Sequence, residues 1–394
     1  MSEGKSDISG WLVRPASWHL WALLAAVLGA ATVRTTRLTS DGGMDNAIVV
    51  RAARTWLDGG SPYDDPHFLY LPGAVLAAAP QALLSPTALR MLVPLAVTAC
   101  LAAGWACALR LHGIPPRSRL AALGLAGLTA GFAPFAHLIL LANWTATAAL
   151  ALPLGLLLAS RGRWAAAAVV FGTAIALKPV LLPMALLLAF AGRWRALALM
   201  IAVPVTASTA SALFLPDPTG FFTRTLPFLL KGDDDFVRLY EASPAAVLPR
   251  LGVPPGLAVL LALLAAAAGV ACAYRRWRRA DPGPLRLTET AAALMLSAFL
   301  VSRPSYDHYL VIVVPLLLAS LPCAGSVARG PWFWLALVPQ LPGVTWPYLE
   351  PVQRRAFKDA LTLCALTFTI VRHGWAGQRR VPVKSAPVTA VTSF

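Results

Sequence analysis

Apolar runs separated by short polar loops fill most of this 394-residue chain. A helix crosses a bilayer with roughly 20 predominantly apolar residues, and many of the runs approach that length. The pattern predicts an all-α polytopic membrane protein with about 11–12 transmembrane segments. The predicted spans lie at 18–34, 88–110, 119–136, 144–160, a pair within 164–191, 196–215, 254–274, 287–302, 308–322, 332–348 and 357–372.

Composition indicates the same class of protein. Hydrophobic residues make up 58% of the chain and charged residues only 13%, whereas soluble domains carry roughly 25% charged residues. The first apolar run lacks a small-residue cleavage site, so residues 1–17 are expected to be a short cytoplasmic tail before a retained span. One membrane domain is then expected over 18–372, followed by a basic, disordered cytoplasmic tail over 373–394.

The net charge of +16 is distributed unevenly along the chain. With the N-terminus inside, the inner loops hold most of the arginines and few acids, as the positive-inside rule requires. The expected outer loops, 35–87, 216–252 and 302–308, are close to neutral together. The basic excess therefore indicates the topology of a multi-pass protein in a bacterial plasma membrane, and a nucleic-acid partner is not expected. The five cysteines form no CxxC or Cys/His cluster, so no zinc site is expected.

The run 164–190 contains an ionisable residue, Lys178. RGRW at its start and GRWR after its end are both typical of inner loops, and about 27 residues are too few for two full crossings. The chain is therefore expected to enter as a short helix, turn at Lys178-Pro179 and return. Lys178 would then lie at the floor of an outward-facing cavity, although a buried lysine can also snorkel to the membrane surface.

The first large outer loop has the densest polar sequence, from Ser40 to Gly73. Residues 44–58 have the apolar spacing of an amphipathic helix at the membrane interface. Residues 65–86 are apolar but interrupted by prolines and a glycine, which favours a re-entrant or interfacial element. A bilayer protein keeps ionisable groups of this kind only where they meet water or form a site.

Polar side chains of the outer loops are the candidates for chemistry, but each also has a structural interpretation. Asp45 precedes Asn46, and aspartate is a favoured cap for the start of a helix. The other structural roles are a turn for Asp41, headgroup anchoring for His67 and Tyr70, pairing with the acidic run 233–235 for Arg224 and Arg238, and the start of a span for His308.

Several motifs, in order along most of the chain, resemble those of glycosyltransferase family 87. This is a family of bacterial transferases that use polyprenyl-phosphate sugars and have the GT-C membrane architecture. The resemblance implies a GT-C-type bundle with an outward-facing, periplasmic cavity. The matching segments are DNAIVVRAA (45–53), GGSPY (59–63), DPHFLYLPG (65–73), GTAIALKP (172–179), RWRAL (193–197), DPTGFFTRTLPF (217–228) and SYDHY (305–309).

Inverting transfer from a lipid-phosphate sugar needs a general base for the acceptor hydroxyl, and a carboxylate suits that role. It also needs cations to hold the departing phosphate. Asp45 is therefore expected to be the catalytic base. The resemblance supports donor-phosphate binding by Lys178, Arg224 and Arg238, and substrate binding by His67, Tyr70, His308, Asp41 and Asn143, with neither a metal nor another cofactor.

Within the family, the DPHFLYLPG, LKP and FFTRTLPF segments are most similar to members that transfer arabinofuranose. The likeness implies a decaprenyl-phosphate-arabinose donor, a cell-wall or lipoglycan arabinan acceptor and α-(1→3) branching, in contact with membrane lipids. Those members have adjacent acids where this chain has Met44-Asp45, so Asp45 matches the second acid and Asp41 matches neither. Two alternatives stay open: a polyprenyl-phosphomannose-dependent α-mannosyltransferase, and a lipid-linked sugar transporter or flippase, which would often show paired interrupted helices.

Overall fold

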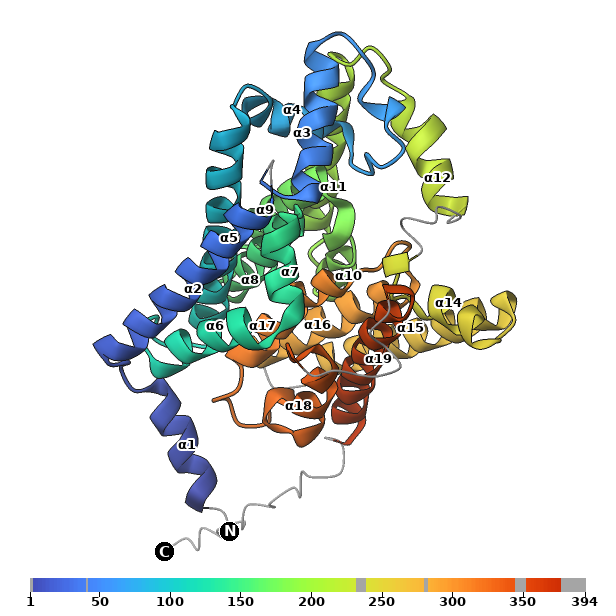
Figure 1. The fold of residues 1–394 in the computed structure, drawn as a ribbon. Helices are drawn as coiled ribbons and strands as arrows, with labels where there is room; N and C mark the ends of the chain where they lie inside the picture. The colour runs from blue at the N-terminus through green and yellow to red at the C-terminus, as the bar shows by residue number, and fades with distance from the viewer. Residues whose placement is uncertain (1–2, 40–41, 232–238, 280–282, 344–351, 377–394) are drawn as a thin grey trace, which may run out of the picture.

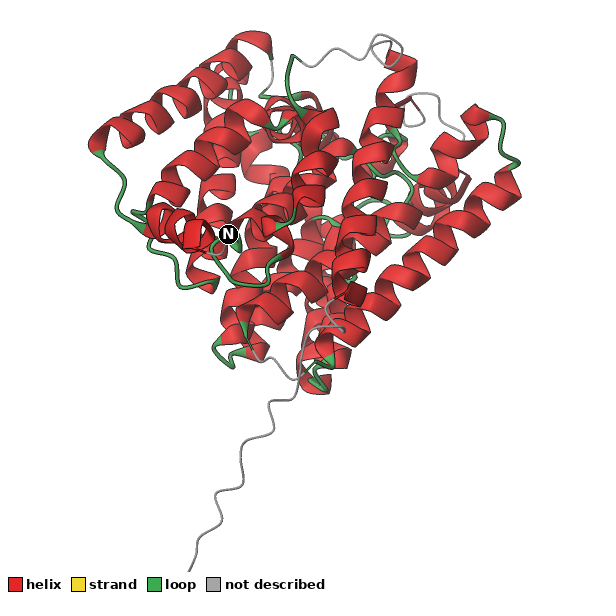
Figure 2. Ribbon diagram, turned by 90° about the horizontal axis from the view of Figure 1, so that it is seen from below, coloured by secondary structure: helices red, strands yellow, loops and turns green. Residues whose placement is uncertain are grey.

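Helices form the regular structure of the chain in the computed structural model, which describes residues 3–39, 42–231, 239–279, 283–343 and 352–376 (Figures 1 and 2). These residues contain no β-strand, so the all-α prediction is confirmed. The α-helices are α1 (Glu3–Val13), α2 (Trp18–Leu38), α3 (Met44–Leu57), α4 (Pro72–Ala82), α5 (Pro86–Leu111), α6 (Arg119–Gly131), α7 (Ala133–Leu141), α8 (Thr145–Ser160), α9 (Trp164–Leu177), α10 (Met184–Phe190), α11 (Trp194–Ala212), α12 (Leu226–Lys231), α14 (Pro244–Val247), α15 (Pro255–Trp277), α16 (Pro284–Val301), α17 (Leu310–Ala319), α18 (Pro331–Leu337) and α19 (Val352–Ala376). The shorter helical turns are η1 (Pro62–Asp64), η2 (Pro179–Leu181), η3 (Phe221–Thr225), η4 (Leu248–Leu251), η5 (Asp307–Tyr309), η6 (Val327–Arg329) and η7 (Val338–Gln340).

Four helices of the described residues, α5, α11, α15 and α16, are long and apolar enough to cross a membrane. The number is five if α6 and α7, which are bent by 75°, form one broken span. Other apolar helices, including α8 and α9, have only 10–17 residues. At 1.5 Å per residue such helices reach about 15–25 Å, less than the ~30 Å hydrocarbon core. Within the described residues, full-length spans are therefore fewer than the 11–12 expected, and prolines such as Pro134 and Pro179 break some of the apolar runs.

Two local predictions for the polar segments are confirmed. The helix expected over 44–58 is α3, which ends at Leu57, while its place at the membrane interface stays a prediction. In the run 164–190, α9 ends at Leu177, Lys178 has an extended backbone, and η2 begins at Pro179. Proline disfavours a helical conformation in the residue before it, which explains why α9 stops there.

Close approach between helices builds the centre of the molecule. Helix α5 packs along α8, α8 along α9, and α9 along α11. A Cβ added at Gly104 of α5 would lie 2.5 Å from the carbonyl oxygen of Ala149 on α8, so only glycine permits this approach. Small residues at such contacts are typical of membrane bundles, where helices associate through van der Waals packing.

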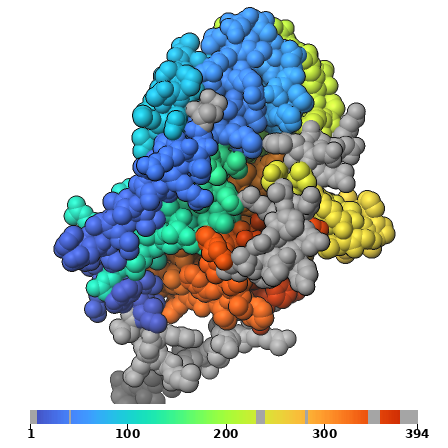
Figure 3. Space-filling model, viewed as in Figure 1, coloured from blue at the N-terminus to red at the C-terminus, as the bar shows by residue number. Residues whose placement is uncertain are grey.

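A lobe formed by α3, α4, η1 and η3 stands above the central helices in Figure 1 and forms the upper part of the surface in Figure 3. Helix α3 packs against α4. Buried aromatic residues fill the lobe, among them Tyr63, Phe68, Tyr70 and Trp144. Because Trp144 precedes α8 of the central bundle, this cluster fixes the lobe on the bundle.

Candidate active site

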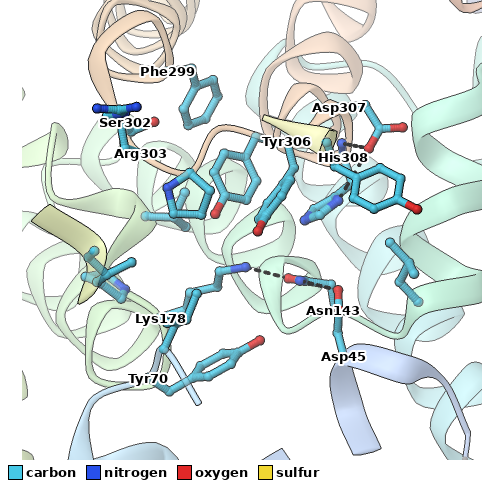
Figure 4. A pocket seen from close by; sticks show the side chains of 18 of the residues that line it. Asp45, Tyr70, Asn143, Lys178, Phe299, Ser302, Arg303, Tyr306, Asp307 and His308 are labelled. Carbon is cyan, nitrogen blue, oxygen red and sulfur yellow. Dashed lines mark hydrogen bonds and ion pairs between the residues drawn. The ribbon is translucent and has the colours of Figure 1, made fainter. Parts of the chain in front are cut away.

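A cavity of about 530 Å³ lies where the lobe meets the central helices (Figure 4). Much of its wall is apolar, with Ile48, Leu141, Val180 and Phe299 among the lining residues. Six of the sequence-predicted residues also line it: Asp45, His67, Tyr70, Asn143, Lys178 and His308. Segments more than 260 residues apart in the chain are thus brought to one internal site, as the resemblance implied.

Asp45 is the second residue of α3, and the N-cap position belongs to Gly43. Its carboxylate does not cap the helix. Instead, Oδ2 accepts a hydrogen bond of 2.6 Å from Nδ2 of Asn143, which lies in the turn between α7 and α8. Among the described residues, no hydrogen bond is made to the other carboxylate oxygen, Oδ1. That oxygen is available to take a proton from a substrate.

The position of Asp45 is set by contacts on either side of it in the chain. Trp144 Nε1 donates to Asn46 Oδ1 at 2.9 Å, and Asn46 Nδ2 donates to Gln81 of α4 at 2.9 Å. The start of α3 is therefore bonded both to the α7–α8 turn and to α4. Gly43 has φ +132°, and a Cβ built on it would lie 2.6 Å from the carbonyl oxygen of Leu141.

Replacing Gly43 with alanine is therefore expected to destabilise the protein by about 1–3 kcal/mol, since it adds both backbone strain and steric overlap. The matched control is Gly59→Ala, because Gly59 also has a positive φ (+84°) but nothing within 4 Å of a built Cβ. It should cost only about 1 kcal/mol. Thermal unfolding of the two purified variants in the same detergent measures the difference. Equal unfolding temperatures would show that the α3–α7 contact is not tight.

Lys178 lines the cavity, and its ammonium group meets the α7–α8 turn. Its Nζ donates to Asn143 Oδ1 at 2.7 Å and to Thr145 Oγ1 at 3.0 Å. The same nitrogen lies 5.0 Å from the centre of the Tyr309 ring and 5.7 Å from that of Tyr70. Cation–π contacts of this kind stabilise an ammonium group away from bulk water. Lys178 lines a cavity, as expected, whereas its place at the floor and the outward orientation of the cavity stay predictions.

Asn143 joins the carboxylate of Asp45 to the ammonium group of Lys178 (Figure 4). Its amide nitrogen donates to the first and its amide oxygen accepts from the second. The side chain is buried, and its oxygen also accepts from the backbone N–H and hydroxyl of Thr145, at 2.8 and 2.7 Å. The amide is thus held rigidly and keeps the two charged groups apart.

His308 lies in a cluster of aromatic rings above Lys178 (Figure 4). Its imidazole is buried and stacks on Tyr306, with 5.3 Å between ring centres. Its Nδ1 lies 3.5 Å from Asp307 Oδ1. Oδ2 of Asp307 contacts Nδ1 of His137 on α7 at 2.6 Å. Asp307 is therefore tied to α7, whereas neither ring nitrogen of His308 makes a hydrogen bond with the described residues. The His308 ring faces the cavity beside Tyr309.

His67 and Tyr70 form the lobe side of the cavity. His67 Nδ1 lies 3.3 Å from Oδ1 of Asp65, which also accepts the backbone N–H of His67 at 2.9 Å. Tyr70 is almost fully buried. Burial, and then the nearby charge of Asp45, raise the pKa of Tyr70 well above its usual value. Its hydroxyl group therefore stays protonated and can donate a hydrogen bond.

The arginines predicted to bind the donor phosphate have a different distribution. Arg224 lies outside the residues that line the cavity and forms ion pairs with Asp64 and, at 2.8 Å, with Asp217. It joins η1 to η3 within the lobe. Arg303, which was not predicted, does line the cavity and pairs with Glu241 at 3.2 Å. The other two candidates, Asp41 and Arg238, lie outside the described residues.

Sequence reasoning assigned no individual role to several lining residues, Arg303, Tyr306, Asp307 and Tyr309, or to His137, which contacts Asp307. Four of these five lie in or beside the SYDHY motif, from which only His308 was selected. The motif could have indicated them, because it forms a polar turn directly before a predicted span. His137 lies in an otherwise apolar helix and had no local signal.

The chain is helical and strongly apolar, and one cavity holds a carboxylate, an ammonium group and tyrosine hydroxyls. It is therefore a multi-pass membrane protein with the polar groups of an enzyme site. The chain belongs to glycosyltransferase family 87, whose family model matches residues 68–302. It is therefore a membrane glycosyltransferase, and the family resemblance predicted from its motifs is confirmed. The match includes Tyr70, Asn143 and Lys178. Asp45 and His308 lie outside the matched range, so the case for them rests on geometry.

The chain is also similar to a protein of Mycobacterium tuberculosis named alpha-(1->3)-arabinofuranosyltransferase, which occurs in two strains. The two sequences are 29% identical over 348 residues, which cover 83% of this chain and 76% of the relative. No solved structure matches the chain significantly. Membership of a transferase family decides against the transporter alternative.

Proposed function

We propose that this glycosyltransferase moves arabinofuranose from a polyprenyl-phosphate donor to an arabinan of the cell envelope, forming an α-(1→3) branch on the outer face of the plasma membrane. The observation that carries the proposal is the hydrogen-bonded series Asp45–Asn143–Lys178 within an apolar cavity. The name of the mycobacterial relative supports the choice of sugar and linkage. The excess of arginine in the predicted inner loops supports an outward-facing site.

Asp45 acts as the general base. Its Oδ1 takes the proton of the acceptor hydroxyl while the acceptor oxygen forms a bond to the anomeric carbon of the donor sugar. The bond from that carbon to the phosphate oxygen breaks, and the polyprenyl phosphate leaves with the bonding electron pair. Asn143 holds Oδ2 at 2.6 Å, so Oδ1 stays oriented toward the acceptor.

Lys178 stabilises the departing phosphate. Its ammonium group is already fixed by Asn143 and Thr145, so little reorganisation is needed as negative charge develops on the leaving oxygen. The third N–H of the ammonium group is not used in these two bonds and can reach the phosphate. Arg303 at the cavity wall pairs with Glu241 through Nε, and its other guanidinium nitrogens can meet the phosphate. The tyrosine hydroxyl of Tyr70 can donate to the sugar.

The apolar part of the cavity suits a lipid-linked donor. Val180 and Leu182 of the turn after Lys178 line it together with Phe299 and Val301 of α16. An isoprenoid chain gains roughly 25 cal/mol for each Å² of apolar surface it removes from water. A soluble sugar nucleotide would leave this wall uncovered, and its base and ribose would find few polar partners there.

The test is a parallel transfer assay with purified protein in detergent. Radiolabelled decaprenyl-phosphoarabinose and polyprenyl-phosphomannose are offered separately, each with an α-(1→5)-arabinan oligosaccharide and with a mannoside acceptor. We expect label to pass from the arabinose donor to the arabinan, in a branch that linkage analysis identifies as α-(1→3). The Asp45→Asn variant serves as the negative control.

Each other result rejects a stated part of the proposal. Transfer of mannose alone would identify the protein as a polyprenyl-phosphomannose-dependent mannosyltransferase of the same family. Transfer from a sugar nucleotide but from neither lipid would reject the polyprenyl-phosphate donor.

A further inference from the structure

A second cavity, of about 920 Å³, adjoins the first. It is bounded by α2, by the bend between α6 and α7, by the chain around η7 and by α19. In Figure 1, α2 runs alongside α6 and α7. The contact between His137 and Asp307 lies between the cavities, since His137 lines the second and Asp307 the first, and Asp359 lines both. Neither Asp45 nor Lys178 lines the second cavity. The second cavity therefore borders the proposed site of transfer, but it has its own cations and apolar wall.

The walls of this second cavity change from apolar to cationic along α2. Val27, Ala30 and Ala31 line its apolar part, and Arg34 lines it further toward the end of the helix. Val27 and Arg34 are seven residues apart, which is about 10 Å along a helix axis. Three alanines of α6 and α7 face this wall from the other side: Ala130, Ala133 and Ala136. Small apolar side chains on both sides leave room for a hydrocarbon chain.

The polar end of the second cavity has two cations, Arg34 and Lys358. Its one carboxylate, Asp359, accepts a hydrogen bond of 2.9 Å from Nε2 of Gln340. Gln340 is fully buried, and its Oε1 accepts no hydrogen bond from the described residues. Cations favour an anionic group, and a buried acceptor without a donor favours a ligand that carries a hydroxyl. These groups lie next to the apolar passage, so one ligand can satisfy both.

We propose that the second cavity binds an anionic phospholipid of the surrounding bilayer. Its phosphate lies between Arg34 and Lys358, its acyl chain lies along the alanine wall, and a headgroup hydroxyl donates to Gln340. The lipid connects α2 with α19, the first and last long helices of the described chain. This binding is independent of the identity of the donor sugar.

Competition between lipids, read by native mass spectrometry, tests the proposal. The delipidated full-length protein is offered phosphatidylglycerol and phosphatidylcholine at equal concentrations in detergent. Two cations near a phosphate predict a preference for phosphatidylglycerol on the order of tenfold. The double variant R34Q/K358Q should lose the preference. The matched control, Arg37→Gln, changes an exposed arginine one turn further along α2 that does not line the cavity, and it should retain the preference.

The variant R34K/K358R keeps both charges and should bind like the unchanged protein, which separates loss of charge from loss of fold. Three results would overturn the proposal. They are equal binding of the two lipids by the unchanged protein, an undiminished preference in R34Q/K358Q, and displacement of phosphatidylglycerol by inorganic phosphate or by polyprenyl phosphate at equal concentration. The last would assign the cavity to a free anion or to the donor lipid. None of these readouts requires sugar transfer, so failure of the proposed function would not affect them.

Discussion

Asp45→Asn is expected to reduce sugar transfer by about 10²- to 10⁴-fold, the range that general-base catalysis contributes. Asparagine has nearly the same shape as aspartate and can keep the contact with Asn143, but it cannot take a proton from the acceptor hydroxyl. The start of α3 is held independently by Asn46, which bonds to Trp144 and Gln81. The variant should therefore fold and insert like the unchanged protein.

The measurement is the initial rate of label transfer from the polyprenyl-phosphate sugar at saturating donor, together with the unfolding temperature in detergent. Asp58→Asn is the matched control, because Asp58 is an exposed carboxylate at the other end of α3. It should transfer at an unchanged rate. A D45N protein that transfers as fast as D58N would eliminate Asp45 as the base, and Asp307 would then be the next carboxylate of the cavity to test.

The sequence predicted the floor of the site because the signals there are local. Charged RGRW and GRWR segments bracket the run 164–190, the run is too short for two crossings, and Pro179 stops a helix. Together these place Lys178 at a break, which is where the structure has it. Asp45 was predicted from its place in the first outer loop, just after the first predicted span, and from its match to an acid of family members.

The pairings across the chain could not be predicted in this way. His137 and Asp307 are 170 residues apart and meet only because α7 bends back against η5. Arg224 has the right charge for a phosphate, but the folding of the lobe places Asp64 and Asp217 next to it, and they take its guanidinium group. Whether a cation faces the cavity depends on which carboxylates lie next to it in the fold. Residue type and spacing along the sequence do not show which carboxylates those will be.

Lys178→Met is the second variant with a large expected effect, a loss of about 10²- to 10³-fold in kcat, as for other preorganised donors to a developing anion. Methionine has a similar length and tolerates the aromatic surroundings of Tyr70 and Tyr309. Asn143 Oδ1 keeps both of its bonds from Thr145, so the turn that positions Asp45 should stay in place. A K178M enzyme with an unchanged kcat would show that the ammonium group does not act on the leaving phosphate.

A double variant distinguishes two ways in which Lys178 can act. If it stabilises the phosphate while Asp45 removes the acceptor proton, the two groups act on different bonds, and D45N/K178M should be slower than D45N alone. If Lys178 only orients Asp45 through Asn143, its loss has no further effect once the carboxylate is gone, and the double variant should match D45N. The hydrogen bonds of Asn143 allow both couplings, but the ammonium group retains one N–H for a ligand in the cavity. We therefore expect the double variant to be the slower of the two.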